Sequence, residues 1–381
     1  MLSAHLGQPI LQFGTSRFLQ AHVDLFVSEA LDADAALGAI TVVQTTDSDE
    51  SAARVAAMAG GAAFPIRIRG LMQGRPVDEV RTCRAVRAAL RTATQWPALR
   101  REMAEGDVRV IVSNTGDAGW RLDVADGRSA LGVDARAPAS FPAKLLVLLH
   151  GRWQARPVDA LTVLPCELVS RNGERLGELV AGLAAAWNLP AAFREWLREH
   201  PVWGNSLVDR IVSEALRPVG AVAEPYALWA IEQQPGLVAP CRHGAIVLTD
   251  DLARVERLKL WLLNLGHSVL AELWLRAATA PDRTVLEAMN EPASRATLEG
   301  VWADEVLPVF DALGEGAAGR DYLVTLRDRL CNPFLAHRLA DIAGNHAQKK
   351  QRRFAPVVAA GREQSPPLAQ PWLEAALAAS A

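Results

Sequence analysis

Lysine is nearly absent from this 381-residue chain. Among its 40 basic residues only Lys144, Lys259, Lys349 and Lys350 are lysines, and the others are arginines. A guanidinium keeps its proton in a protein, whereas an ammonium group can lose it, readily so when it is buried. Proton transfer by an amine side chain is therefore confined to four positions.

Paired cysteines, long apolar runs and basic stretches are also scarce. The four cysteines form no CxxC pair, which argues against a disulfide framework and against a cysteine-bound zinc ion. There is no leader with a charged start and an apolar core, and no apolar stretch of membrane-spanning length. A net charge of −3 gives little support for nucleic-acid binding. We therefore expect a cytoplasmic protein, monomeric or a small homo-oligomer, that binds neither nucleic acid nor membrane.

Strand-like and helix-like segments alternate over the first two thirds of the chain. Residues 9–13, 39–46, 108–113 and 160–165 have the apolar, β-branched character of buried strands. Such alternation predicts an α/β fold with a parallel sheet. Beyond a last strand-like piece at 245–251 the pattern is almost wholly helical. We predict a Rossmann-like, doubly wound dinucleotide-binding domain at 1–250 and a mostly α-helical substrate and catalytic domain at 251–381.

The first strand ends in a glycine turn and the second is followed by an acid, Asp47. This order is the one that a dinucleotide-binding βαβ unit requires. The turn keeps only Gly14 of the GxGxxG pattern, with Ser16 at the second glycine. A plain sheet turn has the same pattern, and Arg17 beside it either contacts phosphate or is a surface arginine. Asp47 either favours NAD over NADP, because a carboxylate repels a 2′-phosphate, or is a polar turn residue.

The run 258–267 is apolar except for Lys259, Asn264 and His267. A helix without a polar face is a buried helix. At about 100° per residue the three polar side chains fall within an arc of roughly 140°. One possibility is that they form a site together. The other is that Lys259 reaches water from a helix end and that His267 is a hydrogen-bonded histidine of the core.

Eight stretches of the chain, in the same order, resemble the polyol-specific long-chain dehydrogenase family, to which mannitol dehydrogenase belongs. Within that family the chain is most similar to the tagaturonate and fructuronate reductase branch. The stretches are QFGTSRFLQAH (12–22), IRGLMQGRPVDEV (68–80), IVSNTGDAG (111–119), FPAKL (141–145), LPCELVSRNG (164–173), NSLVDRIVSE (205–214), VLTDDLARVERLKLWLLNLGHS (247–268) and NHAQKKQRRFAP (345–356). The spacing of Lys, Asn and His in the seventh is the most specific motif.

The resemblance implies the fold above, NAD as cofactor, a small sugar acid or polyol as substrate and no metal. It assigns Lys259 as the catalytic residue, with Asn264 and His267 as its companions. Asp209 and Lys349 fall on substrate-side positions of the family, and Ser113, Asn114 and Thr115 would lie beside the nicotinamide. The residues expected to hold the rest of the cofactor are Phe13, Gly14, Thr15, Ser16, Arg17, Phe18 and Asp47.

The chain departs from the family pattern in three ways. Ser16 replaces the usual second glycine and Gln20 the usual arginine, which bears on pyrophosphate binding. Leu265-Gly266 replaces the more usual Gly-Ala between Asn264 and His267. The chain is also about a fifth shorter than typical uronate reductases.

Hydride transfer to or from a nicotinamide must be balanced by proton transfer at the carbinol oxygen. Desolvation among leucines would lower the pKa of Lys259 and suit it to that role. Asn264 and His267 would hydrogen-bond the same oxygen. Lys349, Arg352 or Arg353 could clamp a uronate carboxylate. The alternative for Lys349 is a position in a solvated loop. Asp209 either orients site residues or pairs with Arg210, and Glu167, at the end of a strand, is a further substrate-side candidate.

These residues predict an NAD-dependent reductase that interconverts a keto-hexuronate and its hydroxy acid. One alternative keeps the chemistry with a neutral polyol, a ketose or a sugar phosphate as substrate. Another is a dinucleotide-binding sensor without turnover.

Overall fold

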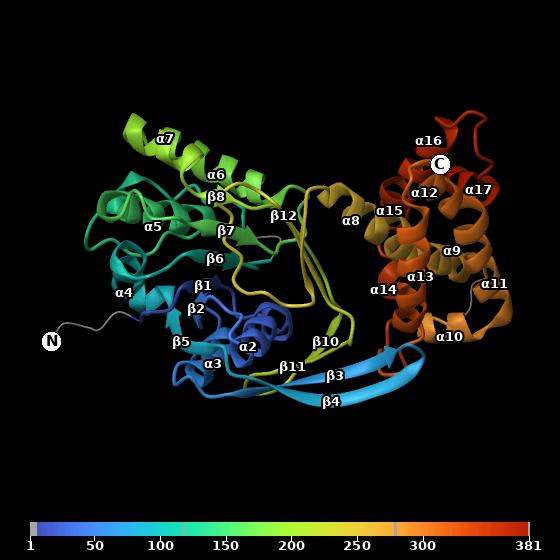
Figure 1. Cartoon of the computed structure of the whole chain (residues 1–381), viewed down its shortest axis with the longest axis horizontal. Helices are drawn as coiled ribbons and strands as arrows, with labels where there is room; N and C mark the ends of the chain where they lie inside the picture. The colour runs from blue at the N-terminus through green and yellow to red at the C-terminus, as the bar shows by residue number, and fades with distance from the viewer. Residues whose placement is uncertain (1–5, 117–118, 278–279, 380–381) are drawn as a thin grey trace. The chain divides into compact units, whose positions relative to one another are not determined.

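The computed structural model describes residues 6–116, 119–277 and 280–379 (Figure 1). Residues 117–118 of the 111–119 stretch lie outside this range. The chain forms two compact units. We call residues 1–68, 79–223 and 227–252 the N-terminal unit, and residues 69–78, 224–226 and 253–381 the C-terminal unit.

A six-stranded parallel sheet forms the centre of the N-terminal unit, with strand order β5-β2-β1-β6-β7-β8. Its strands are β1 (Ile10–Phe13), β2 (Ile40–Gln44), β5 (Val86–Arg91), β6 (Val110–Ser113), β7 (Thr162–Pro165) and β8 (Val202–Trp203). Four of them, β1, β2, β6 and β7, are buried on both faces, as their apolar runs predict. The chain leaves β1 for β2 on one side and later returns to β6 on the other. Ligands bind at such a switch point in open α/β sheets.

Helices connect and cover the strands of this sheet (Figure 1). They are α1 (Arg17–Leu19), the π-helical η1 (Gln20–Asp24), α2 (Leu25–Asp32), α3 (Asp49–Met58), α4 (Thr92–Glu105), the 3-10 turn η2 (Arg128–Leu131), α5 (Phe141–Ala155), α6 (Asn172–Ala186) and α7 (Ala191–Glu199). Helix α5 is apolar along most of its length and packs with α4 and α6 in one core. The predicted α/β architecture is confirmed.

Two smaller sheets complete the strand inventory of the described residues. One has the order β10-β11-β3-β4 and the other β13-β12-β9. Their strands are β3 (Phe64–Met72), β4 (Arg75–Cys83), β9 (Ser206–Asp209), β10 (Val212–Ala215), β11 (Ala221–Ala223), β12 (Leu228–Glu232) and β13 (Ile246–Thr249). The turn between β3 and β4 belongs to the C-terminal unit.

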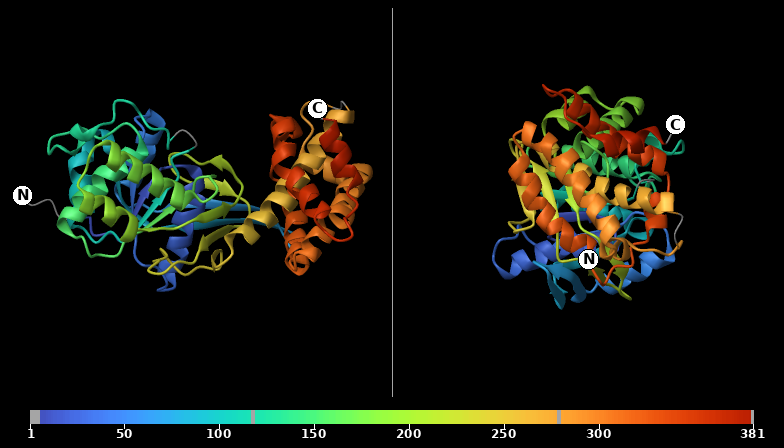
Figure 2. Two further views of the ribbon diagram at one scale, coloured as in Figure 1. Left: turned by 90° about the horizontal axis from the view of Figure 1, so that it is seen from above. Right: turned by 90° about the vertical axis from the view of Figure 1, so that its right-hand side faces the viewer.

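The C-terminal unit is largely helical, as predicted (Figure 2). Its helical segments, starting from α8 at the boundary, are α8 (Leu252–Leu258), η3 (Lys259–Asn264), α9 (Leu265–Ala277), α10 (Val285–Asn290), α11 (Pro292–Gly300), η4 (Val301–Val306), α12 (Leu307–Ala312), α13 (Gly316–Leu330), α14 (Leu339–Ala343), α15 (His346–Arg353), α16 (Ala355–Arg362) and α17 (Pro371–Ala378). Trp302, Phe310 and Phe354 are fully buried in its core. No helix in the described parts of the chain is long and apolar enough to cross a membrane.

Candidate functional site

The glycine turn after β1 fits closely against the end of β6. Gly14 has φ +123°, and a Cβ added there would lie 2.5 Å from the carbonyl oxygen of Asn114. Only glycine meets both conditions without strain. The Ser16 hydroxyl then accepts a hydrogen bond from the backbone N–H of Leu19 at 3.3 Å, which starts the first helical turn. The turn thus brings the ends of β1 and β6 together.

The other residues of the turn differ in exposure. Phe13 and Thr15 are buried, Ser16 and Phe18 are half-buried, and Arg17 is exposed.

Gln20, the departure from the family pattern, supports this turn from inside. Its side chain is buried, donates to the carbonyl oxygen of Thr15 at 3.0 Å and accepts from the N–H of Gly220 at 2.8 Å. A positive charge reaches the turn from elsewhere. Arg54 of α3 donates to the Thr15 hydroxyl at 3.3 Å. We did not identify Arg54 from the sequence, because nothing there relates a helical arginine to a turn 39 residues earlier.

A cavity of about 330 Å³ opens beyond the carboxyl ends of β2 and β6. Its lining includes Thr45, Thr46, Thr115, Ser140 and Lys144. Next to Thr46, the Asp47 side chain is 74% exposed and its carboxylate lies 2.9 Å from a guanidinium nitrogen of Arg91. A cavity at the switch point, a turn that only glycine can make and an exposed acid after β2 fit the requirements of a dinucleotide.

Lys144 is a buried amine in the wall of this cavity. Its Nζ donates to the carbonyl oxygen of Ala139 at 2.6 Å. Burial lowers its pKa to about 8, partly offset by the charge of Asp126. The sequence placed Lys144 in a family motif without giving it a role.

Glu167 holds the segment Ser113–Thr115 in place. Its carboxylate accepts hydrogen bonds from the Ser113 hydroxyl at 2.9 Å, the Thr115 N–H at 2.9 Å and the Thr115 hydroxyl at 3.1 Å. The Asn114 amide donates to the carbonyl oxygen of Cys166 at 2.9 Å. Glu167 is 5% exposed, and burial raises its pKa above the usual 4.5, against the lowering effect of these hydrogen bonds. The acid expected on the substrate side therefore braces two of the residues expected at the nicotinamide, Ser113 and Thr115.

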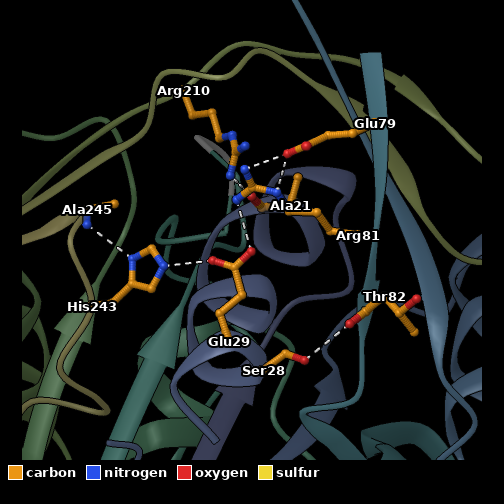
Figure 3. Close-up of polar contacts among 9 residues, drawn as sticks. All are labelled: Ala21, Ser28, Glu29, Glu79, Arg81, Thr82, Arg210, His243 and Ala245. Carbon is orange, nitrogen blue, oxygen red and sulfur yellow. Dashed lines mark hydrogen bonds and ion pairs between the residues drawn. The ribbon is translucent and has the colours of Figure 1, made fainter. Parts of the chain in front are cut away.

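Asp209 and Arg210 are both buried where β9 ends. Arg210 donates to the carbonyl oxygen of Ala21 in η1 (Figure 3). In the same view the carboxylate of Glu29 in α2 accepts hydrogen bonds from Arg81 at 2.9 Å and from His243 at 2.8 Å. These contacts fix η1 and α2, the helical segments that follow the glycine turn.

The Lys259, Asn264 and His267 set spans a change in helix type. Lys259 begins the π-helical η3, Asn264 ends it, and His267 lies in the first turn of α9. A π-turn closes on an i to i+5 hydrogen bond, so residues five apart lie closer in direction than the roughly 140° that an α-helix gives them. Single π-turns inside helices are frequent at functional sites. The sequence predicted an ordinary helix here, and that part of the prediction was wrong.

Burial along this run is uneven. Trp261 to Leu263 and Leu265 to His267 are buried, whereas Lys259 and Asn264 are half-buried. The all-buried helix that we expected is found only in part.

Side chains from two other helices donate hydrogen bonds to carbonyl oxygens of the π-turn. The indole N–H of Trp302 in η4 donates to the carbonyl oxygen of Leu262 at 3.3 Å. Arg353 donates to the carbonyl oxygen of Asn264 at 3.1 Å and to the Ser268 hydroxyl at 2.8 Å. We expected Arg353 to clamp a substrate carboxylate. In the structure its recorded hydrogen bonds go to the π-turn and to α9 instead.

Gly266 makes the Trp302 contact possible. A Cβ on Gly266 would lie 2.7 Å from an indole carbon of Trp302. The departure from the family's Gly-Ala order therefore places a large ring against the π-turn.

His267 is 8% exposed, and its ring hydrogen-bonds to the backbone of Leu263. Burial lowers its pKa well below the usual 6.5, and the nearby His337, Arg329 and Arg353 lower it further. A neutral imidazole that donates one N–H to a carbonyl keeps its other nitrogen as an acceptor. His337, which the sequence did not single out, lies edge-to-face against His267 with 4.9 Å between ring centroids.

Lys349 and its neighbour Lys350 are fixed by different contacts on α15. Lys349 is half-buried and donates to the carbonyl oxygen of Ile342 at 2.7 Å. Lys350 is buried and donates to Glu272 of α9 at 2.9 Å. Glu272 also accepts a hydrogen bond from His346 at 2.8 Å. These contacts hold α15, with Lys349 and Arg353, against the helix that carries His267.

Among the described residues, no group of three or more His, Cys, Asp or Glu side chains is arranged to hold a metal ion.

Two family models match the chain. The mannitol dehydrogenase Rossmann domain matches residues 8–239, and the mannitol dehydrogenase C-terminal domain matches residues 251–372.

Two curated relatives are 29% and 33% identical to the chain over the aligned residues. The altronate oxidoreductase of Klebsiella pneumoniae strain 342 is 33% identical over an alignment of 395 residues, which covers 97% of this chain and 78% of the relative. The altronate oxidoreductase of Bacillus subtilis strain 168 is 29% identical over 380 residues, covering 94% and 76%.

Solved structures show the same fold. A D-sorbitol dehydrogenase in substrate-free form superposes with a TM-score of 0.80 at 19% identity, covering 98% of this chain and 80% of that one. The Pseudomonas fluorescens mannitol 2-dehydrogenase, in a ternary complex with NAD and D-mannitol, gives 0.72 at 21% identity, covering 98% and 79%.

Proposed function

The chain belongs to the mannitol dehydrogenase family of oxidoreductases, and on that premise we propose that it is an NAD-dependent enzyme that interconverts a keto-hexuronate of the tagaturonate or fructuronate type and its hydroxy acid. The observation that carries the proposal is the set Lys259, Asn264 and His267, spaced as in the family on a π-turn that Trp302 and Arg353 support. The named altronate oxidoreductases, with up to 33% identity over nearly the whole chain, support a sugar acid as substrate.

We assign cofactor binding to residues 1–250. The turn Phe13–Phe18 would approach the pyrophosphate, with Gly14 allowing the close contact and Arg17 or Arg54 supplying positive charge. Asp47 would accept hydrogen bonds from the adenosine ribose and disfavour a 2′-phosphate. Ser113, Asn114 and Thr115 would line the nicotinamide, fixed by Glu167.

The bound nicotinamide supplies one chemical step, the uptake or return of a hydride. Residues 251–381 would supply the balancing proton. Lys259 takes the proton of the carbinol during oxidation and returns it during reduction. Lys259 is half-buried, and we expect a bound substrate to remove further water from its amine.

The two companions of Lys259 have different hydrogen-bonding abilities. The Asn264 amide can donate to the reacting oxygen in both directions, because an amide carries two N–H groups. His267 is held neutral by burial, and its bond to Leu263 leaves an acceptor nitrogen. It therefore accepts a hydrogen bond from the carbinol hydroxyl or from the Lys259 ammonium. Asp209, Lys349 and Glu167 remain substrate-side candidates, and the contacts of Glu167 favour a supporting role.

A substrate and cofactor panel tests the proposal. Purified protein is incubated with NADH and tagaturonate, fructuronate or fructose, and with NAD and mannitol, while absorbance of the reduced cofactor is followed. We expect kcat/KM for one keto-hexuronate to exceed that for fructose at least tenfold, with NADPH much poorer than NADH. Preference for fructose or mannitol would replace the acid with a neutral sugar. NADH binding without turnover on any substrate would favour the sensor.

A further inference from the structure

His337 is held rigidly in the segment between α13 and α14. Its carbonyl oxygen accepts the N–H of Val285 at 2.8 Å, and its own N–H donates to the carbonyl oxygen of Leu335 at 3.0 Å. The next residue, Arg338, pairs with Thr284 in an isolated β-bridge. A loop side chain with its backbone fixed on both sides has a defined direction, which a specific contact requires.

The ring of His337 packs against the ring of His267. The centroids are 4.9 Å apart and the planes are inclined by 64°. His267 is buried, whereas His337 is half-buried. A substrate atom that hydrogen-bonds to His267 therefore has His337 among its nearest neighbours.

Positive charge gathers around this pair of rings. The charges of Arg329 and Arg353 act on His267, and the charge of Lys349 acts on His337. Two carboxylates oppose these charges. Glu224 forms a buried ion pair with Arg329 through hydrogen bonds of 2.8 and 3.0 Å, and Asp341, 58% exposed, is paired with Arg338 at 3.1 Å. Arg353 and Lys349 contribute the remaining positive charge, and a bound anion is attracted to it. A neutral sugar gains nothing from this arrangement.

We propose that His337, together with Lys349, recognises the carboxylate of the substrate and thereby selects a sugar acid over a neutral sugar. This inference rests on the proposed function. The imidazole N–H of His337 donates to one carboxylate oxygen, and the Lys349 ammonium is available to the other after leaving the Ile342 carbonyl. We assign Arg353 a supporting role instead, because its Nη1 donates to the carbonyl oxygen of Asn264 and to the Ser268 hydroxyl and so braces the π-turn.

The test compares two substrates on three proteins. Kinetics of keto-hexuronate and fructose reduction are measured for the unaltered protein, for His337→Phe, which keeps a ring against His267 but removes the N–H donor, and for the matched control Arg338→Ala. Arg338 is the adjacent residue, is 56% exposed and pairs with Asp341. We expect His337→Phe to raise KM for the keto-hexuronate by 10- to 100-fold and to change kcat/KM for fructose less than threefold. Arg338→Ala should change both less than threefold.

Three results would overturn the inference. Equal losses on both substrates would mean that His337 only positions His267. No loss on either would mean that His337 does not contact substrate. An unaltered protein that reduces no keto-hexuronate would refute the proposed function itself, and the inference with it. Should fructose turnover be too slow to measure, binding of altronate and of mannitol to the NADH-loaded protein is compared by calorimetry, with the same expected ratio.

Discussion

Replacing Glu167 separates a supporting role from a substrate-binding one. In the structure its carboxylate accepts three hydrogen bonds from Ser113 and Thr115 and is 5% exposed. Glu167→Ala leaves the N–H of the half-buried Thr115 without its acceptor, whereas the two hydroxyls can rotate. An unsatisfied buried donor costs about 1–3 kcal/mol. Adding the lost packing, we expect the free energy of unfolding to fall by about 2–4 kcal/mol.

Glu167→Gln is the matched variant, because it keeps the shape and one acceptor oxygen. That oxygen can still accept from Thr115, and the Ser113 hydroxyl can turn to accept from the new amide. We expect a loss of about 1 kcal/mol or less at pH 7. Burial raises the folded-state pKa of Glu167 above 4.5. The protonated form therefore contributes stability that is present below pH 4.5 and is lost as the pH rises through the folded-state pKa. Glu167→Gln lacks this dependence.

The assay pairs thermal or urea unfolding with NADH titration followed by fluorescence. Because Glu167 holds residues expected at the nicotinamide, Glu167→Ala should weaken NADH binding about tenfold, which corresponds to about 1.4 kcal/mol. Glu167→Gln should weaken it less than threefold. A direct substrate ligand would behave differently, since Glu167→Gln would then raise the substrate KM tenfold or more at unchanged NADH affinity. That result would refute the supporting role.

Two further substitutions test other parts of the structure. Gly266→Ala should destabilise the protein by about 1–2 kcal/mol and lower kcat, because the new Cβ would lie 2.7 Å from Trp302. This loss is expected although alanine is the better helix former. A raised melting temperature with unchanged kcat would show that Trp302 moves aside freely. Asp47→Ala should relax discrimination against NADPH at least tenfold. The substitution removes the repelling carboxylate and frees Arg91, which lies 2.9 Å from it. An unchanged ratio of kcat/KM for NADH and NADPH would mean that Asp47 does not lie at the ribose site.

The sheet was predictable from the sequence, and the Lys259 set, whose role stays a prediction, was identified there, because both are local patterns. Strands buried on both faces are short apolar runs, and β1, β2, β6 and β7 are of this kind. The spacing of Lys259, Asn264 and His267 is a local pattern, which a single sequence displays directly.

The remaining features depend on contacts between distant residues. Apolar periodicity does not distinguish a π-turn from an α-helix, so the widening at 259–264 was missed. Nothing in the sequence shows that Arg353 reaches Asn264, 89 residues away, or that Glu167 binds Thr115, 52 residues away. His337 gave no signal because its ring contact with His267 forms only when α9 and the segment before α14 pack together.

The turnover of proteins in which Lys259 is replaced tests the proposed chemistry most directly. Lys259→Ala and Lys259→Arg are compared with the unaltered protein for keto-hexuronate reduction and for NADH affinity. We expect both to lower kcat by about 10²–10⁴-fold and to leave the NADH dissociation constant within a few-fold, because arginine keeps the charge but cannot exchange the proton. Near-normal kcat in Lys259→Arg would show that charge alone suffices, and near-normal kcat in Lys259→Ala would contradict any role of this amine in proton transfer.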